Sequence, residues 1–403
     1  MSYQRIPNGT ITSPRGFTAG GTFADIKSWK VKPFDLAILK SDAPSTSAGL
    51  FTKNKIKGAP VILCQRRVQT GVSQAIVANS GCANACTGEQ GNIDCARMAE
   101  LTAEYLGLDA ESVMVASTGV IGTLLPMEKI ADGVKRIRLS IDGGHDFAQA
   151  IMTTDTVPKE IAAEVEIEGC KVTIGGVAKG AGMIHPDMAT MLCFLTSDAV
   201  VERDFLQAAL GQVVDASFNM ISIDCDTSTN DMVLMMANGK AGNKTIHNDA
   251  SGASDFISAL NYVCEFLAKS IAADGEGSTK LIEMVVEGAR SVEDARMAAR
   301  TVVSSPLVKT AVYGSDPNWG RILAAVGRSG AYVEESRIDL FLNELCLMRQ
   351  GCPLSFDKVV AEEMMNMSEV VFRLNLNLGD SKATGWGCDL TEEYIALNGD
   401  YTT

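Results

Sequence analysis

Histidine is scarce in this chain: among 403 residues there are only His145, His185 and His247, and they lie far apart in the sequence. A zinc site needs several nitrogen or sulfur ligands that converge on one point. Cys82 and Cys86 form a CxxxC pair, but no second pair and no histidine stands near them. We therefore predict that the chain has no metal site.

Positive charge is scarce as well. The chain has 35 Lys and Arg residues against 49 Asp and Glu residues, which gives a formal net charge of −14. The basic residues are scattered along the sequence, whereas a phosphate backbone or an anionic membrane surface is bound by clustered Lys and Arg. The charge pattern therefore argues against nucleic acid and membrane surfaces as partners.

Long apolar runs are missing too. The run MVLMMA at residues 232–237 is typical of the longest, and a membrane span needs about 18 consecutive apolar residues. Residues 1–17 lack the apolar core of a secretory signal. The eleven cysteines are odd in number and dispersed, as in proteins whose thiols stay reduced. We expect a cytoplasmic protein that crosses no membrane.

What the chain does contain is an alternation of strand and helix patterns. Strand-type runs are expected at residues 34–41, 59–68, 74–81, 190–199, 231–239 and 280–289, and a strand followed by a loop at residues 112–122. Helical spacing covers residues 92–108, 202–218 and 254–275, and Ser291 with Asp294 forms a capping-box pattern before another helical stretch. From residue 370 on, the pattern is that of strands and turns. Strict βαβ units are few, so the expected fold class is α+β.

Two polar motifs fail the requirements of ligand sites. In GGVAKGAG, at residues 175–182, Ala181 stands where a phosphate-binding loop needs lysine. In DCDTSTND, at residues 224–231, Thr229 replaces the glycine of a calcium loop and Met235 replaces its bidentate glutamate. We expect the second motif to be a hydrogen-bonded polar loop.

The stretch AKGAGMIHPDMATMLCF, at residues 178–194, places the small residue Ala189 directly before Thr190. A threonine hydroxyl is a weak nucleophile until a base takes its proton. If the chain is cut before Thr190, the new α-amine has a pKa near neutral pH and supplies that base. The alternative is a plain strand that happens to start with threonine.

Longer sequence motifs favour the interpretation of Thr190 as a nucleophile. The Thr190 segment resembles the processing site of the ornithine acetyltransferase family of arginine biosynthesis. Further family-like blocks follow in the family's order and extend the resemblance over about residues 10–403: NSGCANACTG, STGVIG, IMTTDTVPKE, DCDTSTND, ADGEGSTK, GSDPNWGRILAAVGRSG, GDSKATGWGCDL and NGDYTT.

The resemblance implies a layered αββα fold like that of N-terminal-nucleophile enzymes, in a main domain at residues 1–285. A smaller C-terminal α/β domain would follow at residues 286–403. It also implies self-cleavage between Ala189 and Thr190 into an α chain, residues 1–189, and a β chain, residues 190–403. The cleaved chains are expected to assemble as an α2β2 heterotetramer.

The implied reaction transfers acetyl from N2-acetylornithine to L-glutamate through an acetyl-threonine intermediate, with ping-pong kinetics. No cofactor is implied, and acetyl-CoA use as a second acetyl donor is left open. The resemblance makes Thr190 both nucleophile and base, and Thr118 and Gly119 the oxyanion hole. It assigns substrate contacts to Thr153 or Thr154, Lys179, Thr190, Glu276, Asn398 and Thr403.

The sequence is also compatible with two alternative functions. A self-processed amidase or aminopeptidase would use the same nucleophile, with water in place of glutamate as acceptor. A catalytically silent relative would keep the fold without the cut. Transfer to glutamate separates the first from the acetyltransferase, and a persistent full-length chain identifies the second.

Overall fold

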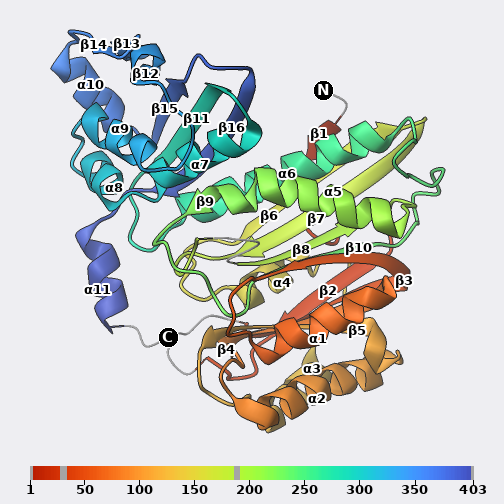
Figure 1. The fold of residues 1–403 in the computed structure, drawn as a ribbon. Coiled ribbons are helices and arrows are strands. Elements are labelled where there is room, and N and C mark those ends of the chain that lie inside the picture. Colours follow the sequence, from red (N-terminus) through yellow and green to blue (C-terminus); the bar gives the residue numbers. More distant parts are fainter. Residues whose placement is uncertain (1–2, 28–33, 186–190, 401–403) are drawn as a thin grey trace.

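The computed structural model describes residues 3–27, 34–185 and 191–400, which form two β-sheets and the helices around them (Figure 1). The predicted site residues Ala189, Thr190 and Thr403 lie outside these ranges.

The larger sheet has nine strands, in the order β1-β6-β7-β8-β10-β3-β4-β5, with β2 paired to β3. Their bounds are β1 Tyr3–Ile6, β2 Phe17–Thr22, β3 Leu36–Phe51, β4 Val72–Cys82, β5 Val113–Val120, β6 Lys159–Ile167, β7 Cys170–Lys179, β8 Leu192–Ser197 and β10 Met232–Ala237.

Strand β3 connects the two halves of this sheet. Its second half, at residues 46–51, pairs with β10, and its first half, at residues 36–41, pairs with β2 and β4. The register against β4 shifts between Lys40 and Ser45, which marks a bulge, and a bulge bends a strand. The halves therefore form two layers joined through one strand.

Helices cover both outer faces of these layers, so that the order is helix, sheet, sheet, helix (Figure 1). On one side α5 (Arg203–Ala216) contacts β3, and α6 (Ala253–Ala273) contacts β6 and β7. On the other side α1 (Ala59–Arg67) and α2 (Gly88–Leu106) contact β5, with α3 (Met127–Arg136) against α2. The predicted α+β class and αββα layering are confirmed.

Alternating side chains of the central strands fill two cores. In β8, Cys193 and Leu195 join the cluster beneath α5 and α6, while Leu192 and Phe194 join the cluster around β2 to β5. This alternation follows from the two-residue period of a strand. Phe147 of α4 (Gly144–Ile151) packs edge-on against Phe194, with ring centroids 5.4 Å apart.

The smaller sheet has seven strands in the order β14-β13-β12-β15-β11-β16-β9. Their bounds are β9 Ile221–Ser222, β11 Leu281–Ala289, β12 Asp339–Leu342, β13 Leu345–Arg349, β14 Cys352–Pro353, β15 Glu369–Asn375 and β16 Ser381–Cys388. The remaining helices are α7 Val292–Val303, α8 Pro306–Tyr313, α9 Trp319–Gly327, α10 Lys358–Met365 and α11 Glu392–Asp400. The expected boundary between residues 285 and 286 falls inside β11, and the division into two domains stays a prediction.

Two predictions of local structure were wrong. Residues 59–68, expected as a strand, form α1: Pro60 occupies its first turn, and Val61, Cys64 and Arg67 are buried at helical spacing. Residues 392–400, expected as strand or turn, form α11. There Thr391 Oγ1 accepts from the N–H of Tyr394 at 3.2 Å, and two glutamates lie in the first turn, where the helix dipole favours negative charge.

In the described part of the chain, α6 is the one helix long and apolar enough to cross a membrane. An 18-residue stretch of this helix has a mean hydropathy of 1.2, and half of that stretch is buried. Its contacts with β6, β7 and α5 are those of a core helix.

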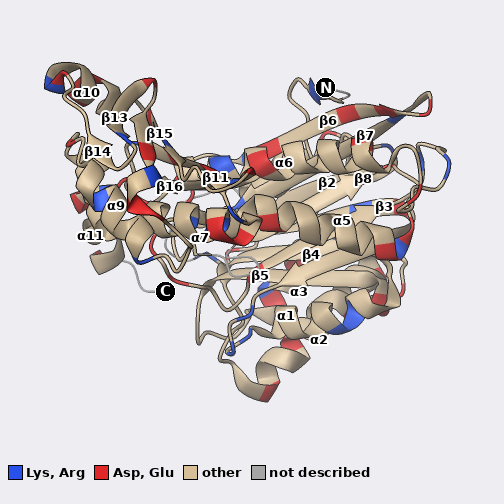
Figure 2. Ribbon diagram, turned by 45° about the horizontal axis from the view of Figure 1, so that its top comes forward, with Lys and Arg blue, Asp and Glu red and all other residues tan. Residues whose placement is uncertain are grey.

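Acidic and basic residues are spread over many elements in the view of Figure 2. All eleven cysteines are free thiols, and burial raises the pKa of the Cys64 thiol to about 12.

Candidate active site

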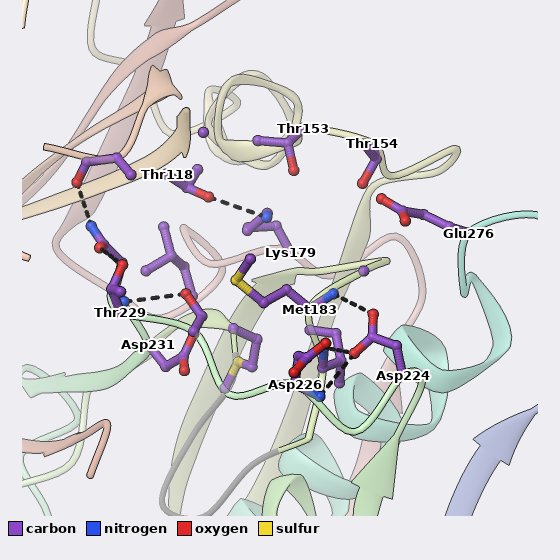
Figure 3. Close-up of a pocket in the computed structure, with 18 of the residues that line it drawn as sticks. Thr118, Thr153, Thr154, Lys179, Met183, Asp224, Asp226, Thr229, Asp231 and Glu276 are labelled. Atoms are coloured by element: carbon purple, nitrogen blue, oxygen red, sulfur yellow. Dashed lines mark hydrogen bonds between the residues drawn. The ribbon is translucent and has the colours of Figure 1, made fainter. Parts of the chain in front are cut away.

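One pocket of about 260 Å³ opens where the two layers meet. It is lined by the ends of β5 and β7, the start of β8, the loop before β10, the turn after α6 and one face of α11. Every site residue predicted from the sequence and described by the structure lies on it: Thr118, Gly119, Thr153, Thr154, Lys179, Glu276 and Asn398. Figure 3 labels five of them, Thr118, Thr153, Thr154, Lys179 and Glu276. Folding thus brings together positions separated by up to 280 residues along the chain (398 − 118).

Thr118 and Gly119 lie near the end of β5, at the pocket wall. The Nζ of Lys179 donates a hydrogen bond to Thr118 Oγ1 at 3.3 Å, as drawn in Figure 3. Gly119 has φ +130°, and a Cβ at this position would come within 2.4 Å of the carbonyl carbon of Gly81 on β4. Only glycine fits this backbone conformation and this close approach, so the sequence places Gly119 here for steric reasons.

The loop before β10 joins the two layers at the pocket. Asn230 Nδ2 donates to the carbonyl oxygen of Ala83 at 2.5 Å and to that of Ser117 at 2.9 Å. These two carbonyls belong to the β4 and β5 side of the fold. Asn230 therefore holds the loop that leads into β10 against β5, the strand that carries Thr118.

Burial dominates the electrostatics of Lys179. Burial lowers the pKa of this ammonium below its usual value, and the positive charge of Lys159 lowers it further. Asp155, Asp231 and Glu276 oppose the shift. A cation poised in this way can bind a carboxylate while it remains protonated.

Glu276 closes the opposite side of the pocket. Its backbone N–H donates to the carbonyl oxygen of Ala181 at 2.8 Å, and its Oε2 accepts from Asn398 Nδ2 at 2.8 Å. A Cβ on Gly182 would lie 2.4 Å from the same Oε2, so a larger residue here would displace the Glu276 carboxylate from its present position. The contact ties α11 to the turn after α6.

The DCDTSTND segment is the hydrogen-bonded loop expected from its sequence. Asp224 accepts from the N–H groups of Met183 at 2.6 Å, Ile184 at 2.8 Å and Asp226 at 3.3 Å. Burial raises the pKa of the Asp224 carboxyl. Sequence reasoning missed that this loop lines the pocket, through Asp224, Asp226, Ser228, Thr229, Asn230 and Asp231. The only sequence signal for this role was the family-like block DCDTSTND itself.

Asp231 is a second acid that sequence reasoning did not single out. Its side chain is buried, and its Oδ2 accepts no hydrogen bond from the residues that the structure describes. Burial raises the pKa of this carboxyl well above its usual value, against the influence of Ser228 and Lys179. The pocket therefore holds a buried acid with an unused acceptor atom.

Tyr394 was missed as well. It projects from α11 into the pocket lining, and burial, Asp224 and Glu276 together raise the pKa of its phenol. The sequence offered no signal for it, because residues 392–400 were not expected to form a helix.

Residues on both sides of the predicted junction reach the pocket. Ile184 precedes it, while Met191 and Leu192 follow it, and all three line the cavity. The carbonyl oxygen of Met191 accepts from the N–H of Met232 at 3.0 Å, which anchors the start of this segment against β10. Among residues 3–27, 34–185 and 191–400, no group of three His, Cys, Asp or Glu side chains could hold a metal ion.

Comparisons with known proteins agree with the resemblance read from the motif blocks. The family model described as the ArgJ family matches residues 18–403. The chain is 52% identical over 398 residues to the arginine biosynthesis bifunctional protein ArgJ of Dehalococcoides mccartyi (strain CBDB1), with 99% of this chain and 98% of that protein covered. It is 46% identical over 396 residues to the protein of the same name from Bacillus subtilis (strain 168), with 98% and 97% covered.

Among solved structures, the chain is similar to the arginine biosynthesis bifunctional protein ArgJ of Bacillus halodurans. The TM-score is 0.50 and the identity 43%, over 51% of this chain and 97% of that chain. The solved chain therefore corresponds to about half of the present one.

Proposed function

The chain belongs to the ArgJ family, and from this membership we propose that it transfers acetyl from N2-acetylornithine to L-glutamate in arginine biosynthesis. Two relatives that cover nearly its full length carry the name arginine biosynthesis bifunctional protein. The observation that carries the proposal is the single pocket on which all seven described site residues converge. Within it, a lysine for a carboxylate lies beside a hydroxyl and a glycine N–H suited to an oxyanion.

We propose further that the chain cuts itself between Ala189 and Thr190. Residues that flank this bond line the pocket on both sides. A solved relative whose whole chain corresponds to about half of this one also supports a two-chain enzyme. The cut would give Thr190 a free α-amine beside its hydroxyl.

The chemistry then follows in two steps. Thr190 Oγ attacks the acetyl carbonyl carbon of N2-acetylornithine, and the α-amine of Thr190 takes the hydroxyl proton. The carbon–nitrogen bond breaks, ornithine leaves with that proton on its nitrogen, and the acetyl group stays on Oγ as an ester. The amine of glutamate attacks this ester and gives a proton to the Thr190 amine. Breakage of the carbon–oxygen bond returns the proton to Oγ.

Each step passes through a tetrahedral oxyanion, for which Thr118 Oγ1 and the Gly119 N–H are the proposed donors. Because Lys179 Nζ already donates to Thr118 Oγ1, the hydroxyl proton of Thr118 is free to point into the pocket. Lys179 is the proposed partner of a substrate carboxylate. Glu276 is the proposed partner of a substrate ammonium group, with its Oε2 held by Asn398.

Thr153 and Thr154 both line the pocket, so either hydroxyl can contact the substrate. The resemblance assigns a further substrate contact to Thr403, which lies outside the described residues. The further proposals are an α2β2 assembly, a cytoplasmic location and no bound cofactor.

The first experiment is an intact-mass spectrum of the purified protein beside the Thr190→Ala variant. We expect two fragments that end and begin at the Ala189–Thr190 bond in the wild type, and one uncut chain in the variant. A full-length wild-type chain would overturn the self-cleavage proposal and favour a catalytically silent relative.

The second experiment follows labelled acetyl from N2-acetylornithine. We expect the label in N-acetylglutamate, formed with parallel lines in double-reciprocal plots of a ping-pong reaction. Release of free acetate at the same rate with and without glutamate would instead identify an amidase.

A further inference from the structure

Behind the pocket lies a cluster of three buried charges, Asp155, Lys159 and Asp274, here called the buried ion network. Lys159 Nζ donates to Asp155 Oδ1 at 2.7 Å and to Asp274 Oδ2 at 2.5 Å. The residues are 2%, 2% and 9% exposed. They are not among the described residues that line the pocket.

Asp155 binds two segments that carry pocket residues. Its Oδ2 accepts from the backbone N–H of Thr153 at 2.9 Å, and its Oδ1 accepts from the N–H of Gly180 at 2.7 Å. Thr153 itself lines the pocket, and Gly180 directly follows Lys179. One carboxylate therefore sets the distance between two predicted substrate contacts that come from different elements.

Asp274 ties in a third segment. It follows the last residue of α6 and lies two residues before Glu276. It accepts from the backbone N–H of Thr156 at 3.0 Å and also from the Thr156 hydroxyl. Through Lys159, the segments that carry Thr153, Lys179 and Glu276 are thus joined by charge-assisted hydrogen bonds.

Stability alone does not account for such a network. Removing two carboxylates and an ammonium group from water is costly, and apolar residues of similar size often serve as well or better. Charged groups that bind backbone N–H donors at short distances do, however, define position and direction. The arrangement suits a task in which the pocket residues must keep their geometry.

We propose that the buried ion network is a positioning device for the acetyltransferase pocket, with Asp155 as its central residue. This inference rests on the proposed function. It assigns to Asp155, Lys159 and Asp274 a role exerted through the pocket residues and without substrate contact.

The charges around Lys179 give the inference a specific signature. Asp155, Asp231 and Glu276 favour the charged form of Lys179, while burial and Lys159 disfavour it. Removal of the Asp155 charge should therefore lower the pKa of Lys179 further. If substrate binding needs charged Lys179, kcat/KM then begins to fall at a lower pH on the alkaline side.

Asp155→Asn tests this, with Asp198→Asn as the matched control. Asp198 is 0% exposed and accepts from the N–H of Thr173 at 2.7 Å, at the end of β7 remote from Lys179. We expect Asp155→Asn to lower kcat/KM roughly 100-fold, the typical cost of a small misplacement of reacting groups. Its alkaline limb should move to lower pH, while Asp198→Asn keeps the wild-type profile.

Equal losses in both variants, or an unmoved alkaline limb in a folded Asp155→Asn, would overturn the inference. If Asp155→Asn does not fold, Asp274→Asn replaces it, and wild-type KM values for both substrates in that folded variant would overturn the inference too.

A measurement without turnover separates this inference from the proposed function. The pKa of Lys179 can be followed by NMR after reductive 13C-methylation, with Lys179→Arg for assignment. A lower pKa in Asp155→Asn, and an unchanged one in Asp198→Asn, supports the network even if the wild type transfers no acetyl to glutamate. An unchanged pKa in Asp155→Asn contradicts it.

Discussion

At the scale of single residues, the pocket combines groups whose charges work against one another. Burial favours the neutral form of Lys179, whereas Asp155, Asp231 and Glu276 favour its charged form. Such opposed shifts are common at functional sites. They also mean that the effect of a single substitution on activity does not predict its effect on stability.

Thr118→Ala removes the proposed oxyanion donor. We expect kcat to fall by roughly 10²- to 10³-fold, the usual loss for one such donor. The melting temperature should change little, because Thr118 is only half-buried. Steady-state kinetics and thermal unfolding measure both effects. Thr118→Ser keeps the hydroxyl and should recover most of kcat; equal losses in both variants would argue for a packing role.

Asp231→Asn should stabilise the protein. Its raised pKa shows that the ionised carboxyl is disfavoured in the fold, so stability is lost as the pH rises from the unfolded pKa through the folded one. The amide avoids this loss. We expect the melting temperature at pH 8 to rise by roughly 1–3 °C, with no gain near pH 4. Asp155→Asn should lower the melting temperature at pH 8 instead, because the positive charges of Lys159 and Lys179 outweigh burial and hold the pKa of the Asp155 carboxyl below its usual value.

Residue identities could be predicted where they stand in contiguous motifs. Thr118, Lys179 and Glu276 were found in this way, and folding brings them to one pocket. Asp231 and Tyr394 could not be found, because burial and the proximity of segments far apart in the chain arise only on folding. A composition or a spacing does not show that Asp231 Oδ2 lacks a donor among the described residues.

At the scale of elements, polar contacts tie helix α11 to the pocket. None of its residues is buried. Thr391 Oγ1 donates to the carbonyl oxygen of Gly277 at 2.8 Å, just before the helix begins, and Asn398 binds Glu276. A helix without buried side chains contributes little to the stability of the fold.

A chain that ends at Thr391 should therefore fold but lose activity. We expect a melting temperature close to that of the wild type and a fall of at least about 100-fold in kcat/KM, because Glu276 loses its orienting partner. Ile395→Ala, on the exposed side of the helix where this side chain is 68% exposed, is the matched control and should retain activity. A fully active truncated enzyme would exclude α11 from the site.

The same helix shows where element prediction failed. Long periodic segments such as α6 were predicted correctly because their apolar faces repeat over many turns. Residues 59–68 were misassigned because a short apolar run has no clear period, and only the packing of α1 decides between helix and strand. Residues 392–400 have no apolar face to detect, since α11 is exposed.

At the scale of the whole molecule, the order of strands in the large sheet is decisive. Strands β8 and β10, which follow the proposed cut, lie between β7 and β3, which precede it. On one side β8 pairs with β7, and on the other β10 pairs with β3. The side chains of β8 also enter both hydrophobic cores.

We therefore expect the two chains to stay together after cleavage. Size-exclusion chromatography should give the same native mass for the cleaved wild type and for uncut Thr190→Ala. The two fragments should separate only in denaturant. Spontaneous release of one fragment in buffer would contradict the strand order described above.

Because strands of both chains alternate in one sheet, folding before the cut and refolding after the cut should differ in efficiency. An uncut chain reaches this arrangement in a reaction of one molecule, whereas two separate chains must first meet, so that recovery depends on concentration. Once denatured, the mature enzyme should regain activity far less readily than Thr190→Ala regains its fold. The covalent link between Ala189 and Thr190 would then be required once, to keep the two halves together while the sheet forms, and would be dispensable afterwards.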